Sequence, residues 1–183
     1  MSDELIVRHC SPTLAGMKTG NLFTCLFESD VEMRTSMRHW NQKFRKKGLR
    51  VLPLRYCNGR ALIYMYRPAR LSQDLQHATA CRLLQERGYT SAAADRCVVH
   101  LKKRINECEK FPHEIGLFLG YPPEDVCGFI ENKPGSCKYV GCWKVYGDTE
   151  AAKKIFAKYK KCTAVYCAKL ARGKSIDRLA VAG

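Results

Sequence analysis

The sequence is poor in acidic residues and has no long hydrophobic run. Two acids follow Met1 and no apolar stretch comes after them, so neither a secretory signal nor a membrane anchor is readable, and we expect a cytoplasmic protein without a membrane partner. The chain also has no internal repeat, no low-complexity segment, no glycine-rich phosphate loop and no zinc-finger or RNA-recognition signature. The usual motifs of nucleotide hydrolases and of many nucleic-acid-binding modules are therefore absent.

Cysteine, in contrast, is abundant. The 11 cysteines are an odd number in a 183-residue chain that is long enough to bury a full core, which favours reduced thiols over a disulfide framework. No Cys-x2-Cys pair occurs, and this argues against an iron–sulfur cluster. A structural metal is the alternative, because four sulfurs lie in the last third, at Cys137, Cys142, Cys162 and Cys167. Their spacing differs from that of zinc knuckles, so we expect no metal site and no cofactor.

Basic residues outnumber acidic ones, 32 to 17, and give a net charge of +15. The densest basic stretches lie within residues 34–47 and 153–161. A positive field of this size attracts nucleic acids, anionic lipid or acidic proteins, and it also serves solubility. Charge alone therefore leaves the partner open.

Hydrophobic periodicity and capping residues predict an α+β fold, a small and mostly antiparallel sheet of about four strands packed with about six helices. The predicted helices cover residues 12–27, 29–47, 72–87 and 90–108, followed by one beginning at 123 and a final one capped by Asp148 or Thr149. The predicted strands cover residues 49–56, 60–66, 114–119 and 139–146, the first two joined at an Asn-Gly turn. Pro53 in the first strand indicates a sheet edge or a bulge.

The length favours one globular domain over residues 1–173. Within it, residues 68–110 are a candidate inserted helical hairpin, and residues 174–183 are expected to form a mobile tail.

Two distant segments suggest a catalytic pair. Ser11 and Pro12 are typical of a helix start, which would place Cys10 where helix amides stabilise an anion and lower the pKa of a thiol. His113 opens an apolar, strand-like run and is the best-placed base by context, with Glu114 available to orient it. The alternative is a buried cysteine and a strand-edge histidine that do not meet.

The same helix start could bind an anion. Ser11, Thr13 and Lys18 surround it in sequence, and Tyr146 is a further candidate for contact with a substrate. These residues would suit a small phosphorylated ligand or an acyl substrate.

Two resemblances extend these hypotheses. The Cys10-Ser11 pair and the run from His113 to Gly120 are similar to motifs of the papain-like hydrolases of the NlpC/P60 type, which implies a cysteine nucleophile. Over nearly the whole chain, the sequence resembles the bacterial family called domain of unknown function 3793, through residues 9–16, 111–126 and 141–146. That resemblance implies no assigned activity; the proximity of such genes to flavodoxin or iron-uptake genes implies a role in iron or redox metabolism.

Two functions of different classes follow. The first is a thiol-dependent enzyme that uses Cys10 and His113 for acyl transfer, amide hydrolysis or thiol redox chemistry. The second is a non-catalytic basic module that binds nucleic acid or an acidic protein such as a flavodoxin. Salt separates them, because binding by charge weakens as salt rises whereas thiol reactivity hardly changes.

Overall fold

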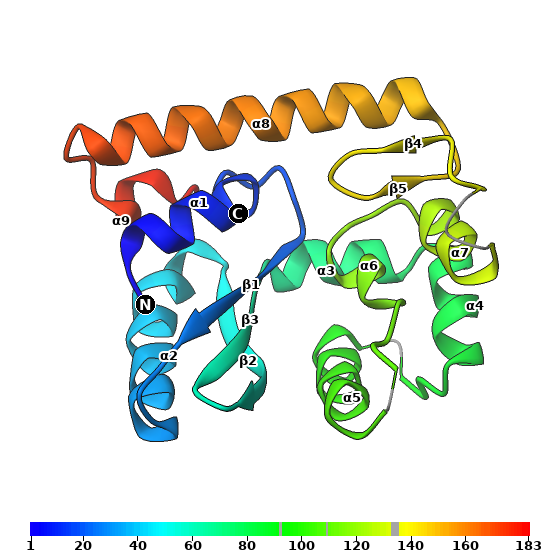
Figure 1. The fold of residues 1–183 in the computed structure, drawn as a ribbon, viewed down its shortest axis with the longest axis horizontal. Coiled ribbons are helices and arrows are strands. Elements are labelled where there is room, and N and C mark those ends of the chain that lie inside the picture. The colour runs from blue at the N-terminus through cyan, green and yellow to red at the C-terminus, as the bar shows by residue number, and fades with distance from the viewer. Residues whose placement is uncertain (92, 109, 133–135) are drawn as a thin grey trace.

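The structure, a computed structural model, describes residues 1–91, 93–108, 110–132 and 136–183 and has an α+β fold (Figure 1). Its described helices are α1 Asp3–Leu14, α2 Asp30–Phe44, the 3-10 turn η1 Arg45–Lys47, α3 Pro68–Leu75, α4 Ala78–Glu86, α5 Ala94–Glu107, α6 Ile115–Phe118, α7 Pro123–Glu131, α8 Thr149–Ala171 and α9 Ile176–Leu179. Its described strands are β1 Gly20–Leu26, β2 Arg50–Cys57, β3 Arg60–Tyr66, β4 Tyr139–Val140 and β5 Lys144–Val145. No helix within these described ranges is long and apolar enough to cross a membrane.

The main sheet has the order β1-β3-β2, and both pairings are antiparallel. The predicted hairpin is confirmed: Asn58 and Gly59 adopt φ values of 50° and 71° in the turn between β2 and β3. Pro53 lies in the edge strand β2, next to a break in register between Pro53 and Arg55. The edge position and the bulge both accommodate a residue that has no backbone N–H.

Two helix starts are confirmed by their caps. The Ser29 side chain accepts a hydrogen bond from the Glu32 amide at the start of α2, and Asp148 accepts from Glu150 and Ala151 at the start of α8. Gly48, with φ of 70°, follows η1 and ends this helical stretch as expected.

The first predicted helix is wrong in its position. The helix begins at Ser2, whose side chain accepts a hydrogen bond from the Leu5 amide, and it ends before Gly16, which has a φ of 73°. Acidic side chains in the first turn favour this earlier start. Residues 20–26 form β1 because they pair along the whole length of β3, a long-range contact that outweighs local helical spacing.

Three other segments also differ from prediction. Residues 115–118 form the short helix α6 rather than a strand, and the flanking run is buried, so its apolar composition could not distinguish helix from strand. Residues 139–146 contain a two-strand hairpin instead of one strand, with Lys144 pairing with Val140. The helix predicted over residues 72–87 is two helices, α3 and α4.

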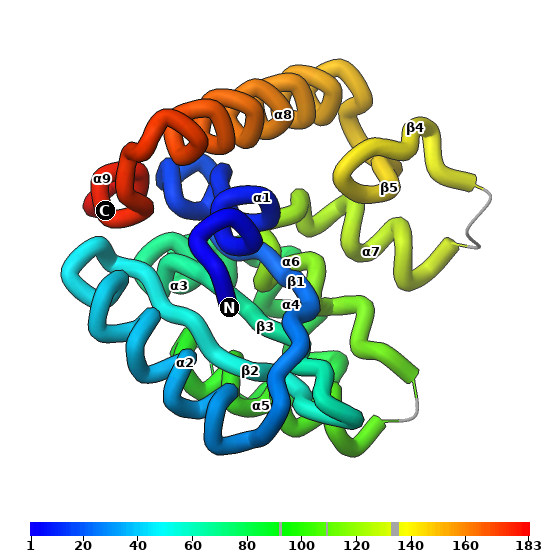
Figure 2. Tube along the Cα trace, turned by 60° about the vertical axis from the view of Figure 1, so that its left-hand side comes forward, coloured from blue at the N-terminus to red at the C-terminus, as the bar shows by residue number. Residues whose placement is uncertain are grey.

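The two faces of the main sheet support two hydrophobic clusters. The first cluster joins the sheet to α1, α2 and α9, and the second joins it to α3, α4, α5, α6 and α7. A third, smaller cluster forms where Trp143 and Val145 of the β4–β5 region meet Ala152 of α8. The long helix α8 lies along α1, and β4 and β5 lie by its first turns (Figures 1 and 2).

The C-terminal residues differ from the expected mobile tail. Ile176, Leu179 and Ala180 are buried in the first cluster. The Val181 amide donates to the carbonyl of Leu14 at the end of α1. This segment therefore completes the core beneath α8.

Candidate functional site

Cys10 lies in the interior of α1, far from the helix start at Ser2, so the predicted position at an anion-stabilising helix N-terminus is wrong. Its side chain is 0% exposed and belongs to the first hydrophobic cluster. Burial raises the pKa of the Cys10 thiol, and the nearby charge of Lys18 offsets this only in part. The thiol is therefore protonated at neutral pH.

Ser11 and Thr13 do not form an anion site. Ser11 is in the helix rather than at its N-cap, and its hydroxyl donates to the Val7 carbonyl at 2.5 Å. The Thr13 hydroxyl donates to the Asn21 side-chain oxygen at 2.7 Å and so ties α1 to β1. Both side chains are fully buried and hold the fold together.

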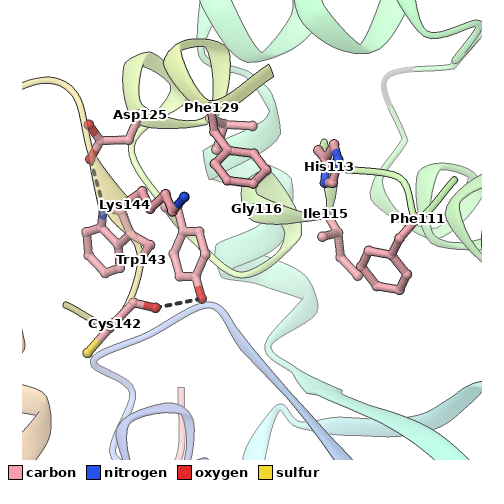
Figure 3. Close-up of a pocket in the computed structure, with 11 residues that line it drawn as sticks. Phe111, His113, Ile115, Gly116, Asp125, Phe129, Cys142, Trp143 and Lys144 are labelled. Carbon is pink, nitrogen blue, oxygen red and sulfur yellow. Dashed lines mark hydrogen bonds between the residues drawn. The ribbon is translucent and has the colours of Figure 1, made fainter. Parts of the chain in front are cut away.

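His113 lies elsewhere, at the edge of an apolar pocket of about 220 Å³ that we call the aromatic pocket (Figure 3). Its ring meets the Phe129 ring edge-on, with centroids 4.9 Å apart. Figure 3 shows Asp125, Trp143 and Lys144 on the other side of Phe129. The full lining is Phe111, His113, Ile115, Gly116, Tyr121, Asp125, Val126, Phe129, Cys142, Trp143 and Lys144.

Glu114 does not orient His113. It is buried, and its carboxylate oxygen lies 2.6 Å from the Arg104 Nε atom and accepts a hydrogen bond from the Tyr89 hydroxyl at 3.1 Å. This carboxylate therefore ties α6 to α5. Cys10 packs in the first cluster, whereas His113 lines the aromatic pocket. No described contact links the two side chains.

The carboxylate in the aromatic pocket, Asp125, also has structural hydrogen-bond partners. Asp125 accepts a hydrogen bond from the Trp143 indole at 2.7 Å and further ones from the backbone amides of Tyr146 and Gly147. Tyr146 packs over Gly128, where an added Cβ would lie 2.5 Å from the tyrosine ring. Asp125 and Tyr146 thus fix the end of the β4–β5 region against α7.

A second cavity, of about 740 Å³, lies between α1, β1, the β4–β5 region and α8; we call it the Lys18 groove. It combines aromatic and basic side chains and has no Asp or Glu in its lining. The lining residues are His9, Pro12, Lys18, Asn21, Tyr121, Tyr139, Gly141, Cys142, Phe156, Tyr159, Lys160, Thr163 and Ala164.

Lys18 is the unusual side chain of this groove because it is only 5% exposed. Its Nζ atom lies 5.1 Å from the centroid of the Tyr121 ring and 6.0 Å from that of Tyr159. Within the described residues, its amine has no hydrogen bond and no carboxylate partner. Burial lowers the pKa of Lys18 to about 8, while the thiols of Cys142 and Cys10 act in the opposite direction.

The two tyrosines present neutral rings to this amine. Burial raises the pKa of both Tyr121 and Tyr159 to about 12. The Tyr121 hydroxyl donates to the Cys142 carbonyl and the Tyr159 hydroxyl to the Met17 carbonyl, each at 3.5 Å. The ring faces are therefore left for the cation, a contact that is favourable but weaker than an ion pair.

Sequence reasoning identified Lys18 but missed its surroundings. Lys18 was expected to act beside a helix start, whereas it follows the end of α1 and is enclosed by residues from distant elements. Tyr159 of α8 is half-buried, packs against the third hydrophobic cluster and also lines the groove. No local signal could have paired it with Tyr121.

All 11 cysteines are free thiols. Within the ranges that the structure describes, no three His, Cys, Asp or Glu side chains are grouped so that they could hold a metal ion. The four sulfurs considered above as a metal set therefore do not converge.

Comparison with known proteins gives one match. A model of the family described as protein of unknown function, DUF3793, matches residues 6–180. Comparisons with curated proteins and with solved structures give no match, and the similarity to NlpC/P60 hydrolases has no support. Since the family model covers nearly the whole sequence, the chain belongs to the DUF3793 family.

Proposed function

We propose that this protein is a non-catalytic binding module whose Lys18 groove binds a nucleotide unit of a single-stranded polynucleotide. The observation that carries the proposal is the buried Lys18 amine, which has no acidic partner among the described residues and is bordered by aromatic rings. A buried cation without a counterion is costly, and a phosphate would provide the missing partner. Aromatic faces stack on any base, which gives affinity without sequence preference.

The helix beside the groove supports the same ligand. Exposed lysines follow α8 past the aromatic side chains, at positions 153, 154, 158, 160 and 161. Lys153 is paired with Glu150 at 2.8 Å, whereas the other four form no ion pair in the described part of the chain. With the net charge of +15, these lysines would attract a polyanion at long range.

A thiol-dependent enzyme is less well supported. That hypothesis needs an activated thiolate within hydrogen-bond reach of a base. Cys10 is fully buried with a raised pKa, and the partners of His113 and Glu114 lie in other parts of the fold. The positive charge would also attract an acidic protein such as a flavodoxin, but binding of such a partner gives no role to the aromatic rings of the groove.

The test is fluorescence anisotropy with labelled single-stranded oligonucleotides, in deoxyribo and ribo forms, at several salt concentrations. Lys18→Met keeps an unbranched side chain of similar size and removes the charge, so we expect affinity to fall about tenfold or more. Tyr159→Leu removes a stacking face and is expected to cost about 1–3 kcal/mol of binding free energy. Lys169→Met is the matched control, because it removes one charge from the exposed end of α8, outside the groove.

Three outcomes would oppose the proposal. Absence of oligonucleotide binding by the wild type refutes it, and binding to an acidic flavodoxin under the same conditions would then favour the protein partner. Equal losses of affinity in Lys18→Met and Lys169→Met would mean that binding depends on the overall positive charge and not on the groove. Retained affinity in Lys18→Met would remove the groove from the binding site.

A further inference from the structure

A third cavity, of about 560 Å³, is lined by four arginines, and we call it the arginine groove. No Asp or Glu occurs in its lining. The lining residues are Ala15, Gly16, Arg45, Gly48, Arg50, Arg67, Pro68, Ala69, Arg70, Gln73, Val181, Ala182 and Gly183. Four guanidinium groups around a cavity without Asp or Glu side chains favour an anionic ligand.

One of the four arginines has a structural role. Arg67 is 5% exposed, and it donates to the carbonyls of Thr13, Leu14, Lys47 and Val181 at distances of 2.7–3.3 Å. Its charge contributes to the floor of the groove, but its donors are used by backbone oxygens.

The other three arginines keep donors available. Arg50 donates through Nη1 to the Leu49 carbonyl and Arg70 through Nη1 to the Gly16 carbonyl, and each guanidinium carries five N–H donors in all. Arg45 is exposed and has no side-chain hydrogen bond within the described residues. None of the three forms an ion pair with a described carboxylate. Planar forks of this kind match phosphate oxygens well.

The arginine groove and the Lys18 groove are neighbours across the turn that follows α1. Gly16 lines the first and Lys18 the second. Arg70 donates a hydrogen bond to the Gly16 carbonyl, and the Tyr159 hydroxyl donates one to the carbonyl of the next residue, Met17. The Arg70 charge acts against the burial that raises the pKa of Tyr159, which agrees with their proximity.

We propose that the arginine groove binds phosphates of the same strand whose base occupies the Lys18 groove, with Arg45, Arg50 and Arg70 as the phosphate contacts. This inference rests on the proposed function and extends it, because it assigns a second subsite and a path between the two. A strand seated in the Lys18 groove would pass the turn at residues 15–18 and meet the arginines on its other side. Affinity should therefore depend on strand length.

The experiment compares a labelled trinucleotide, which suffices for the nucleotide contact proposed for the Lys18 groove, with a strand of about 15 nucleotides, which is long enough to follow both grooves. Wild type is expected to bind the longer strand at least tenfold more tightly. In Arg45→Gln/Arg50→Gln, the longer strand should lose most of that advantage, while the trinucleotide should bind as in wild type. The slope of log affinity against log salt should fall by about 0.7 for each phosphate contact removed, or about 1.4 in total.

The matched control is Arg38→Gln/Arg60→Gln, which removes two exposed arginines from outside both grooves. Thermal melting of both double variants separates loss of contact from loss of folding. The inference is overturned, while the proposed function stands, in either of two cases. In the first, the arginine-groove variant binds the longer strand as tightly as wild type does; in the second, it loses no more affinity for that strand than the control variant loses. If wild type binds neither oligonucleotide, both fail together. Deoxyribo and ribo strands in parallel identify which polynucleotide is preferred.

Discussion

Lys18 makes the stability of this protein depend on pH in a direction that can be calculated. In the unfolded chain a lysine has an ordinary pKa of 10.5, whereas burial lowers the pKa of Lys18 to about 8 in the folded protein. Between these two values the unfolded state binds more protons, so the contribution of Lys18 to stability rises with pH. This pKa difference corresponds to a destabilisation of the folded state by about 3 kcal/mol. The destabilisation is present in full near neutral pH and is absent above pH 10.5.

The perturbation that isolates this contribution is Lys18→Met. Methionine fills similar space without a charge, so the variant should be more stable than wild type at pH 7, by up to about 3 kcal/mol less the lost contacts with the two tyrosine rings. That advantage should shrink as pH rises from 8 to 10.5, because wild-type Lys18 becomes neutral in the folded state. Comparing the two proteins at each pH cancels the titration of groups that do not interact with Lys18; Cys142 and Cys10, whose pKa values the Lys18 charge lowers, are the exceptions.

The assay is urea unfolding, followed by tryptophan fluorescence, of both proteins at intervals from pH 7 to 10.5. The quantity of interest is the difference between the two free energies of unfolding at each pH. A difference that stays constant across this range, or that grows with pH, would refute the assignment of an uncompensated buried amine.

Three further perturbations test the structure around the sites. Cys10 should resist alkylation by iodoacetamide in the native protein and react only on unfolding, as peptide mass spectrometry would show, because its thiol is fully buried with a raised pKa; native reactivity would contradict its burial. Gly141→Ala should destabilise the protein by about 1–3 kcal/mol in urea unfolding, since the new Cβ would lie 2.2 Å from the Phe156 ring; unchanged stability would contradict this packing. Glu114→Ala should cost about 1–3 kcal/mol by leaving the Arg104 guanidinium without its partner, a value reduced by the partial exposure of that arginine; a cost that high salt removes entirely would indicate a surface pair instead.

Local signals predicted much of the fold because they concern neighbours in sequence. The Ser29 and Asp148 caps, the Asn58-Gly59 turn and the bulge near Pro53 all depend on contacts within a few residues. The start of the chain was misplaced because Ser11 and Pro12 also fit inside a helix, and because β1 is stabilised by pairing with β3 about 40 residues away.

The candidate site was less accessible from sequence. Lys18 was identified for a reason that proved wrong, a helix start that the structure places at Ser2. What makes Lys18 distinctive is its enclosure by Tyr121 and Tyr159, which lie more than 100 residues further along the chain. Enclosure of this kind depends on tertiary packing, and residue type and spacing do not encode it locally.

The hydrogen bonds of Arg67 affect how this protein unfolds. Its guanidinium holds carbonyls from the end of α1, from η1 and from Val181, so three chain segments share one buried cation. Releasing the C-terminal segment would leave donors of that cation unsatisfied in the interior, which is costly. Fraying at this end should therefore be suppressed, and amide exchange there should occur through the same cooperative opening as in α1. The first helix and the last residues are expected to behave as a single unit of unfolding.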